Sequence, residues 1–284
     1  MTTTSASSES SVSSVSSVLA RCRAEGRAAL IGYLPVGYPD VPGSIDAMVA
    51  MVEAGVDIVE VGVPYTDPLI DGPVIQYAAE TALRHGTRVD DVFLATAAVR
   101  AAGAPALVMT YWNLVLRRGV DAFAADLAAA GGAGLITPDL IPDEAATAGA
   151  DWLAASERHG LDRVFLVAPS STPQRLAAAT AACRGFVYAA SVMGVTGTRD
   201  SVGSAAEGLV ERTRKVTDLP VCVGLGVSTG EQAAQVARFA DGVAVGSALV
   251  RALTEAPDLA TGIHDLRELV AELADGVRGR TRTP

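Results

Sequence analysis

A glutamate in the middle of an apolar strand is the residue of this sequence with the clearest chemical meaning. Residues 56–63 are largely apolar and predict a β-strand, and Glu60 lies near its centre. Because side chains alternate along a strand, Glu60 points away from the face that Val59 and Val61 share. A strand this apolar is typical of a parallel sheet that is buried on both faces. Burying a carboxylate costs several kcal/mol unless it has an ion-pair partner or is protonated, and a protein keeps such a group where it has a function. Glu60 is therefore a candidate catalytic residue.

Two more carboxylates follow in a loop that prolines stiffen. The loop carries Asp67 and Asp71 and is interrupted by Pro64, Pro68 and Pro73. Because the loop starts where the strand ends, its aspartates are close enough to share a cavity with the strand's glutamate. Carboxyl groups that share a cavity favour acid–base chemistry.

Other side chains that could do chemistry are scarce or unsuitably placed. Among the 22 basic residues the single lysine is Lys215, in a predicted helix that precedes a strand, so a Schiff-base mechanism has no lysine to use. His85 and His159 precede helix-ending glycines and His264 lies on the last predicted helix, positions typical of capping or solvated residues. No group of residues has the spacing of a metal site, so we expect no metal. Carboxylates and tyrosines remain as catalysts.

Eight short strands that alternate with helices must position these groups. Eight such units in about 250 residues predict an α/β protein with a single (β/α)8 TIM barrel. A doubly wound sheet would need a GxGxxG motif after the first strand, and residues 32–37 do not have that pattern. The predicted strands are Ala28–Leu34, Val56–Val63, Ala106–Trp112, Gly134–Asp139, Arg163–Ala168, Phe186–Val192, Val221–Val227 and Gly242–Ala248. The predicted helices include Val41–Glu53, Val89–Ala102, Val120–Ala130, Ala145–His159, Pro173–Ala182, Ala205–Val216 and Glu231–Arg238.

The barrel is expected to span residues 18–275 and to open with a short N-terminal helix. Residues 1–17 are mostly Ser, Thr and Val without a basic residue, which predicts a disordered tail. Residues 276–284 are expected to form a flexible C-terminal tail. No shift in composition separates a second domain.

The composition restricts the compartment and the partners. The chain has 284 residues and a net charge of -10, which argues against nucleic acids and anionic membranes as partners. No apolar run approaches the roughly 18 residues of a membrane span. Its three cysteines, Cys22, Cys183 and Cys222, form no CxxC motif, which favours a reducing compartment. We expect a soluble, cytoplasmic protein.

Glycine-rich segments follow the last three predicted strands. They cover residues 194–197, 224–228 and 245–247. Glycine lets the backbone approach an oxyanion closely, and N–H groups at a helix start attract negative charge. Barrels of this kind often bind phosphate with the loops after strands seven and eight. The sequence therefore predicts a phosphorylated ligand.

The residues from Glu60 to Pro73 resemble the signature of the tryptophan synthase alpha subunit. Residues 33–39, 138–144 and 194–197 resemble further segments of that family, in the same order. The resemblance extends from about residue 18 to the C-terminus. It implies a lyase that cleaves indole-3-glycerol phosphate to indole and glyceraldehyde 3-phosphate, a retro-aldol step of L-tryptophan biosynthesis.

The resemblance also implies a role for particular residues. Glu60 matches the general acid–base, Asp71 matches the aspartate that steadies positive charge on the indole nitrogen, and Tyr188 lines the pocket beside the glutamate. The remaining matches are Gly197, Gly226, Gly246 and Ser247 for the phosphate, Thr196 in a lid over Asp71, and Tyr33, Tyr111 and Ile136 for the indole ring.

The same resemblance implies a partner and a place for the cofactor. The family's alpha subunit pairs with a beta subunit, as an alpha2beta2 heterotetramer in which pyridoxal phosphate belongs to the beta subunit. This chain itself is then expected to hold no cofactor. Asp67 and Pro68 lie in the loop that communicates with the beta subunit.

Three other functions remain to be weighed. One is a stand-alone lyase with the same reaction that needs no beta subunit. Another is a phosphate-sugar isomerase or cyclase, whose aspartates at strands one and five are absent from residues 33–35 and 168–170. The last is a non-catalytic regulatory barrel, which the presence of Glu60 and Asp71 argues against.

Overall fold

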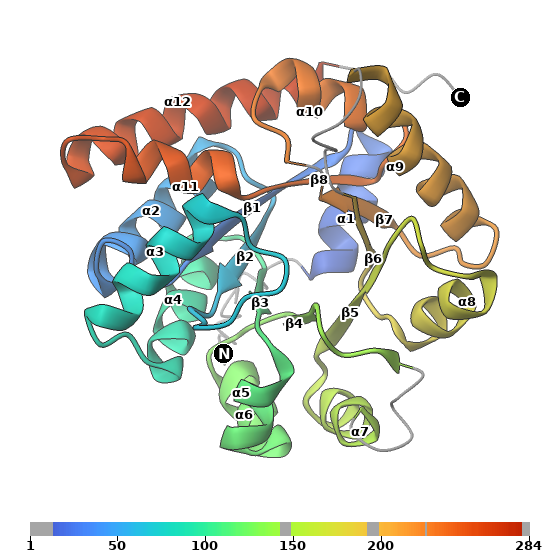
Figure 1. The fold of residues 1–284 in the computed structure, drawn as a ribbon, viewed down its shortest axis with the longest axis horizontal. Coiled ribbons are helices and arrows are strands. Elements are labelled where there is room, and N and C mark those ends of the chain that lie inside the picture. Colours follow the sequence, from blue (N-terminus) through green and yellow to red (C-terminus); the bar gives the residue numbers. More distant parts are fainter. Residues whose placement is uncertain (1–13, 143–148, 192–198, 225, 280–284) are drawn as a thin grey trace, which may run out of the picture.

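Eight parallel strands pair in chain order and the eighth pairs with the first, so the sheet closes on itself in the computed structural model (Figure 1). The structure describes residues 14–142, 149–191, 199–224 and 226–279. The predicted (β/α)8 TIM barrel is confirmed. The strands are β1 (Ala29–Pro35), β2 (Ile58–Gly62), β3 (Ala106–Met109), β4 (Gly134–Thr137), β5 (Asp162–Val167), β6 (Val187–Ala190), β7 (Val221–Gly224) and β8 (Gly242–Val245).

Helices surround the barrel on its outside and connect each strand to the next (Figure 1). Within the described residues, no helix combines the length and the apolar character that crossing a membrane requires. The helices are α1 (Val15–Ala24), α2 (Val41–Ala54), α3 (Pro73–Arg84), α4 (Val89–Ala101), α5 (Trp112–Arg118), α6 (Val120–Ala129), α7 (Ala150–His159), α8 (Pro173–Ala182), α9 (Arg199–Arg214), α10 (Gly230–Val236), α11 (Ser247–Thr254) and α12 (Leu259–Arg278).

Most predicted strands were too long at their C-terminal ends, and the third and the eighth show why. The third ends at Met109 rather than at Trp112, because the Trp112 backbone N–H donates to both carboxylate oxygens of Asp139 at 3.0 Å and begins α5. The eighth ends at Val245, and Ser247 already begins α11. In both cases a helix starts directly after the strand, so an apolar run passes from strand into helix without a change of composition.

The buried side chains form an outer and an inner layer. Val59 and Val61 belong to the outer layer, between the strands and the surrounding helices. Ile58 belongs to the inner layer, inside the barrel, with Phe186, which directly precedes β6, and with Leu19 of α1. The short helix α1 therefore packs against the barrel interior rather than against its outside. The predicted alternation of the Glu60 strand is confirmed, because its valines face outward.

Both ends of the folded chain extend beyond the predicted boundaries. Helix α1 begins at Val15, where Ser14 caps it by accepting a hydrogen bond from Ser17 N at 3.1 Å, so the last residues assigned to the tail are helical. Helix α12 continues past residue 275 because Val277 is fully buried. Residues 1–13 and 280–284 lie outside the described residues, as do residues 143–148 of the helix predicted to start at 145.

A buried ion pair ties the starts of β1 and β2 together. Arg27 donates to Asp57 through Nη1 at 2.7 Å and Nη2 at 2.9 Å, and Asp57 also accepts from Leu30 N at 2.9 Å. Both charged side chains are less than a tenth exposed. The hydrogen bonds from Arg27 to Asp57 are the main cause that raises the pKa of the guanidinium. The pair fixes the end of the barrel that α1 covers.

We expect the Asp57→Ala substitution to lower the free energy of unfolding by about 3 kcal/mol, because Arg27 loses its buried carboxylate partner and is left with the half-exposed Glu25, and the Leu30 N–H loses its acceptor. Urea denaturation followed by circular dichroism measures this loss. Asp121→Ala, which removes an exposed partner of Arg158, is the control and should leave the midpoint unchanged. Equal midpoints for the Asp57 variant and the wild type would contradict the prediction.

Candidate active site

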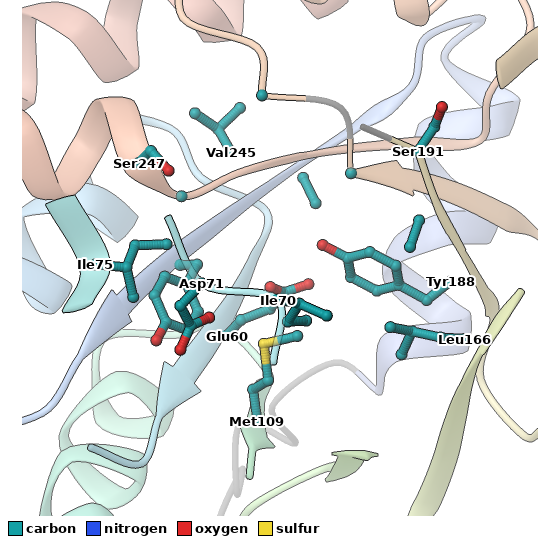
Figure 2. A pocket seen from close by; sticks show the side chains of 16 residues that line it. Glu60, Ile70, Asp71, Ile75, Met109, Leu166, Tyr188, Ser191, Val245 and Ser247 are labelled. Atoms are coloured by element: carbon teal, nitrogen blue, oxygen red, sulfur yellow. The ribbon is translucent and has the colours of Figure 1, made fainter. Parts of the chain in front are cut away.

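A cavity of about 410 Å³ opens at the C-terminal ends of the strands (Figure 2). Inward-facing residues of β1, β2, β3, β5, β6, β7 and β8 form its walls, together with the loop after β2. The lining residues are Tyr33, Glu60, Ile70, Asp71, Ile75, Met109, Leu166, Tyr188, Ala190, Ser191, Gly224, Gly226, Ala244, Val245, Gly246 and Ser247. The cavity brings together residues that lie more than 200 positions apart in the sequence.

Glu60 lies on the inner face of β2 and is 1% exposed. Its Oε1 atom has no hydrogen-bond partner among the described residues. Burial disfavours the charged form and raises the pKa of Glu60 to about 8. At neutral pH the carboxyl therefore holds a proton, which it can donate to a molecule in the cavity.

Asp71 approaches the same cavity from the loop after β2. Figure 2 shows the side chains of Glu60 and Asp71 projecting into the cavity. Burial raises the pKa of Asp71, although this side chain is less enclosed than Glu60. The Asp71 carbonyl accepts a hydrogen bond from Gln76 Nε2 at 2.8 Å, which ties the loop to α3. Of the two loop aspartates predicted to share a cavity with Glu60, Asp71 does so, whereas Asp67 is exposed and does not line the cavity.

Two tyrosines fit into the barrel because glycines lie beside them on the neighbouring strands. Tyr188 pairs with Cys222 in the register of β6 and β7, so Gly224 is the next inward-facing residue of β7. A Cβ atom at Gly224 would lie only 2.8 Å from Cε1 of Tyr188. At Gly62 a Cβ atom would lie 2.6 Å from Cζ of Tyr33. These glycines create the space for the rings, a role that the strand register reveals and the sequence did not.

Burial raises the pKa values of Tyr33 and Tyr188 well above the ordinary tyrosine value. The negative charge of Asp71 contributes further at Tyr33, and that of Glu60 contributes at both tyrosines. Both phenols therefore keep their protons at neutral pH. They are polar but uncharged groups beside the buried carboxyl groups.

An apolar wall completes one side of the cavity. It includes Met109 of β3 and Leu166 of β5, which face inward and were not among the predicted site residues. The signal for them was the alternation along their strands, which places every second residue inside. Ile136 is fully buried in the inner layer and does not line the cavity. Tyr111 lines a small adjoining cavity that Asp71 also borders.

The opposite side is rich in backbone donors. Gly226, Gly246 and Ser247 line it as predicted, and Figure 2 shows Ser247 across the cavity from Leu166. Helix α11 begins at Ser247, and the first N–H groups of a helix have no partner within it. Among the described lining residues there is no lysine or arginine, so an anion here would depend on backbone N–H groups. Thr196 and Gly197 lie outside the described residues.

Fold and site together define an enzyme of the TIM-barrel class, with two carboxyl groups between an apolar wall and a rim rich in backbone N–H groups. Comparison with known proteins narrows this class to one family. A family model described as "Tryptophan synthase alpha chain" matches residues 19–278. The chain belongs to the tryptophan synthase alpha chain family.

Individual relatives agree with this assignment. The tryptophan synthase alpha chain of Mycobacterium avium (strain 104) is 65% identical over 263 residues, which make up 93% of this chain and 94% of that protein. A solved structure of Mycobacterium tuberculosis tryptophan synthase in space group F222 has a TM-score of 0.86 at 64% identity, covering 94% of this chain and 99% of that one. The tryptophan synthase subunit alpha of Legionella pneumophila str. Paris has a TM-score of 0.83 at 29% identity, covering 94% and 98%.

The predicted activity follows from this family. The chain is a lyase that cleaves indole-3-glycerol phosphate, as the alpha chain of tryptophan synthase does. The family assignment fits this function and not the stand-alone lyase or the non-catalytic barrel. Alpha chains carry no cofactor, since pyridoxal phosphate belongs to the beta subunit.

The raised pKa of Glu60 makes the stability of the protein depend on pH. Between about pH 4.5 and pH 8 the unfolded chain loses the Glu60 proton while the folded chain keeps it, so stability falls as the pH rises through this range. Glu60→Gln removes this effect. We expect this variant to unfold several degrees above the wild type at pH 8.5, with a clearly smaller difference at pH 5.5, in differential scanning calorimetry.

The exposed Glu80 provides the control for this measurement, because Glu80→Gln makes the same chemical change on the surface of α3. It should shift the unfolding temperature equally little at both pH values. A Glu60→Gln difference that is the same at pH 5.5 and pH 8.5 would show that Glu60 titrates normally in the folded protein.

Proposed function

We propose that Glu60 is the general acid–base of indole-3-glycerol phosphate cleavage. The observation that carries this proposal is a buried, protonated carboxyl whose Oε1 has no partner among the described residues and which faces the cavity. Breaking the bond between the indole ring carbon and the side chain requires a proton on that carbon and removal of the side-chain hydroxyl proton. A carboxyl with a pKa near neutrality can serve both transfers.

Asp71 is proposed to stabilise the charge that this chemistry creates. Protonation of the ring carbon makes the indole nitrogen positive, and the electrons of the breaking bond then return to the ring. A carboxylate that accepts a hydrogen bond from this nitrogen stabilises the intermediate more than the substrate. The approaching positive charge also favours the ionised form of Asp71, whose pKa burial alone raises.

The remaining lining residues are proposed to hold the two ends of the substrate. Backbone N–H groups near Gly226, Gly246 and Ser247 are suited to the phosphate, since the start of α11 attracts anions. The indole ring then lies toward Met109 and Tyr33, on the apolar side. This orientation leaves the reacting carbon between the carboxyl groups.

We expect Glu60→Gln and Asp71→Asn each to slow indole release from indole-3-glycerol phosphate by about 10²-fold or more, the scale of acid–base and charge-stabilising groups. Steady-state assays of indole formation by the full chain measure this. Asp67→Asn is the matched control, because Asp67 is an exposed carboxylate of the same loop that does not line the cavity. Near wild-type turnover of Glu60→Gln would refute the proposed mechanism.

We further propose that the chain works in the cytoplasm as the alpha subunit of an alpha2beta2 heterotetramer. Matching structures include the aminoacrylate-bound form of M. tuberculosis tryptophan synthase. The loop after β2 supports a contact at the rim of the cavity, because Leu69 and Ile70 expose 76% and 52% of their surface there. Asp67 and Pro68 belong to the same loop, and apolar side chains this exposed are typical of an interface.

Mixing the chain with a tryptophan synthase beta chain should raise indole release and form a particle with two copies of each, as measured by light scattering. Leu69→Asp should weaken the stimulation by tenfold or more, relative to the variant's own unstimulated rate, because it places a charge in the contact. Leu94→Asp is the control, because Leu94 lies on α4 and is 59% exposed. This variant should keep the full stimulation by the beta chain. Equal stimulation of both variants would place the contact elsewhere.

A further inference from the structure

The hydroxyl of Tyr111 holds the backbone of the loop that carries Asp71. Tyr111 lies between β3 and α5 and is 6% exposed. Its oxygen accepts hydrogen bonds from Leu69 N at 2.8 Å and from Ile70 N at 3.4 Å. These two amides directly precede Asp71. A side chain far away in the sequence therefore determines where the loop lies.

The loop has few other anchors. The side chain of Leu69 is 76% exposed, and that of Ile70, although it lines the cavity, is 52% exposed, so neither packs the loop firmly against the barrel. Thr66 and Asp67 are exposed as well, and the Thr66 hydroxyl donates to Asp67 at 2.6 Å, within the loop itself. The contact from Gln76 to the Asp71 carbonyl lies on the far side of Asp71. Between residues 65 and 71, Tyr111 thus supplies the main connection to the barrel.

Tyr111 is itself held firmly from two sides. Its ring stacks on that of Tyr65, with centroids 4.5 Å apart and an interplanar angle of 26°, so it contacts the beginning of the same loop. The next residue, Trp112, donates its N–H to both carboxylate oxygens of Asp139, which follows β4. These contacts connect the loops that follow β2, β3 and β4, and they hold the backbone directly before Asp71.

We propose that Tyr111 is a positioning residue for Asp71, which keeps this carboxylate at the place where positive charge develops on the substrate. The proposal rests on the proposed role of Asp71. Tyr111 does not line the main cavity but borders a small adjoining cavity that Asp71 also lines, and its hydrogen bonds go to the loop, so we place its action at the loop and not at the indole ring. A shift of the loop would move the carboxylate without changing the rest of the cavity.

Tyr111→Phe tests this role, because it removes the acceptor oxygen and keeps the stacked ring. We expect kcat of indole release to fall about tenfold, because both loop amides lose their acceptor, while KM for indole-3-glycerol phosphate stays within twofold. In the Asp71→Asn background the same substitution should change kcat less than twofold, since the carboxylate to be positioned is gone. The full chain is used throughout, and thermal unfolding verifies that each variant is folded.

Tyr65→Phe is the matched control, because it makes the same change in the other ring of the stacked pair. Within the described residues the Tyr65 hydroxyl has no hydrogen bond, so this variant should keep wild-type kcat. A full tenfold effect of Tyr111→Phe in the Asp71→Asn background, or a raised KM with unchanged kcat, would overturn the positioning role. Wild-type turnover of Asp71→Asn alone would instead refute the proposed function of Asp71.

Discussion

The burial of one carboxyl group without a compensating charge is the constraint on which the rest of this site depends. A Glu60 side chain in water would be ionised at neutral pH and could not donate a proton. The closed barrel supplies the apolar surroundings that keep the proton in place, and no described cation lies near enough to reverse the effect. The inner layer below and helix α1 close the barrel from the other end. An open sheet would expose this group to solvent and lower its pKa.

The same site must also hold a phosphorylated molecule in a chain with a net charge of -10. Lysine or arginine side chains near Glu60 would attract the phosphate, but they would also favour ionisation of the carboxyl. Backbone N–H groups at the start of α11 avoid this conflict, because their partial charges act within a short range. The proposed phosphate site at this rim would therefore be compatible with a protonated Glu60 for an electrostatic reason as well as a geometric one.

Much of this arrangement could be predicted from the sequence because it follows from periodicity. The alternation of the strand placed Glu60 inside, and the glycine-rich ends of β7 and β8 indicated the rim. The predictions that failed concerned features that depend on contacts between distant segments of the chain. The start of α5 depends on Asp139, and α1 begins early because Val15 packs inside the barrel. The hydrogen bonds of Tyr111 likewise could not be predicted, because the sequence does not indicate which backbone amides lie near its hydroxyl.

Helix α1 also affects the order in which the protein can be completed during synthesis. This helix is made earlier than the strands, yet the buried cluster it joins includes Phe186, which directly precedes β6, and Ala244 of β8, which are made late. A growing chain therefore holds the first helix without its packing partners until the last strand closes the barrel. Until that moment water can reach the interior, and the glutamate is an ordinary ionised side chain. The raised pKa of Glu60 therefore depends on closure of the whole barrel, because burial is its cause.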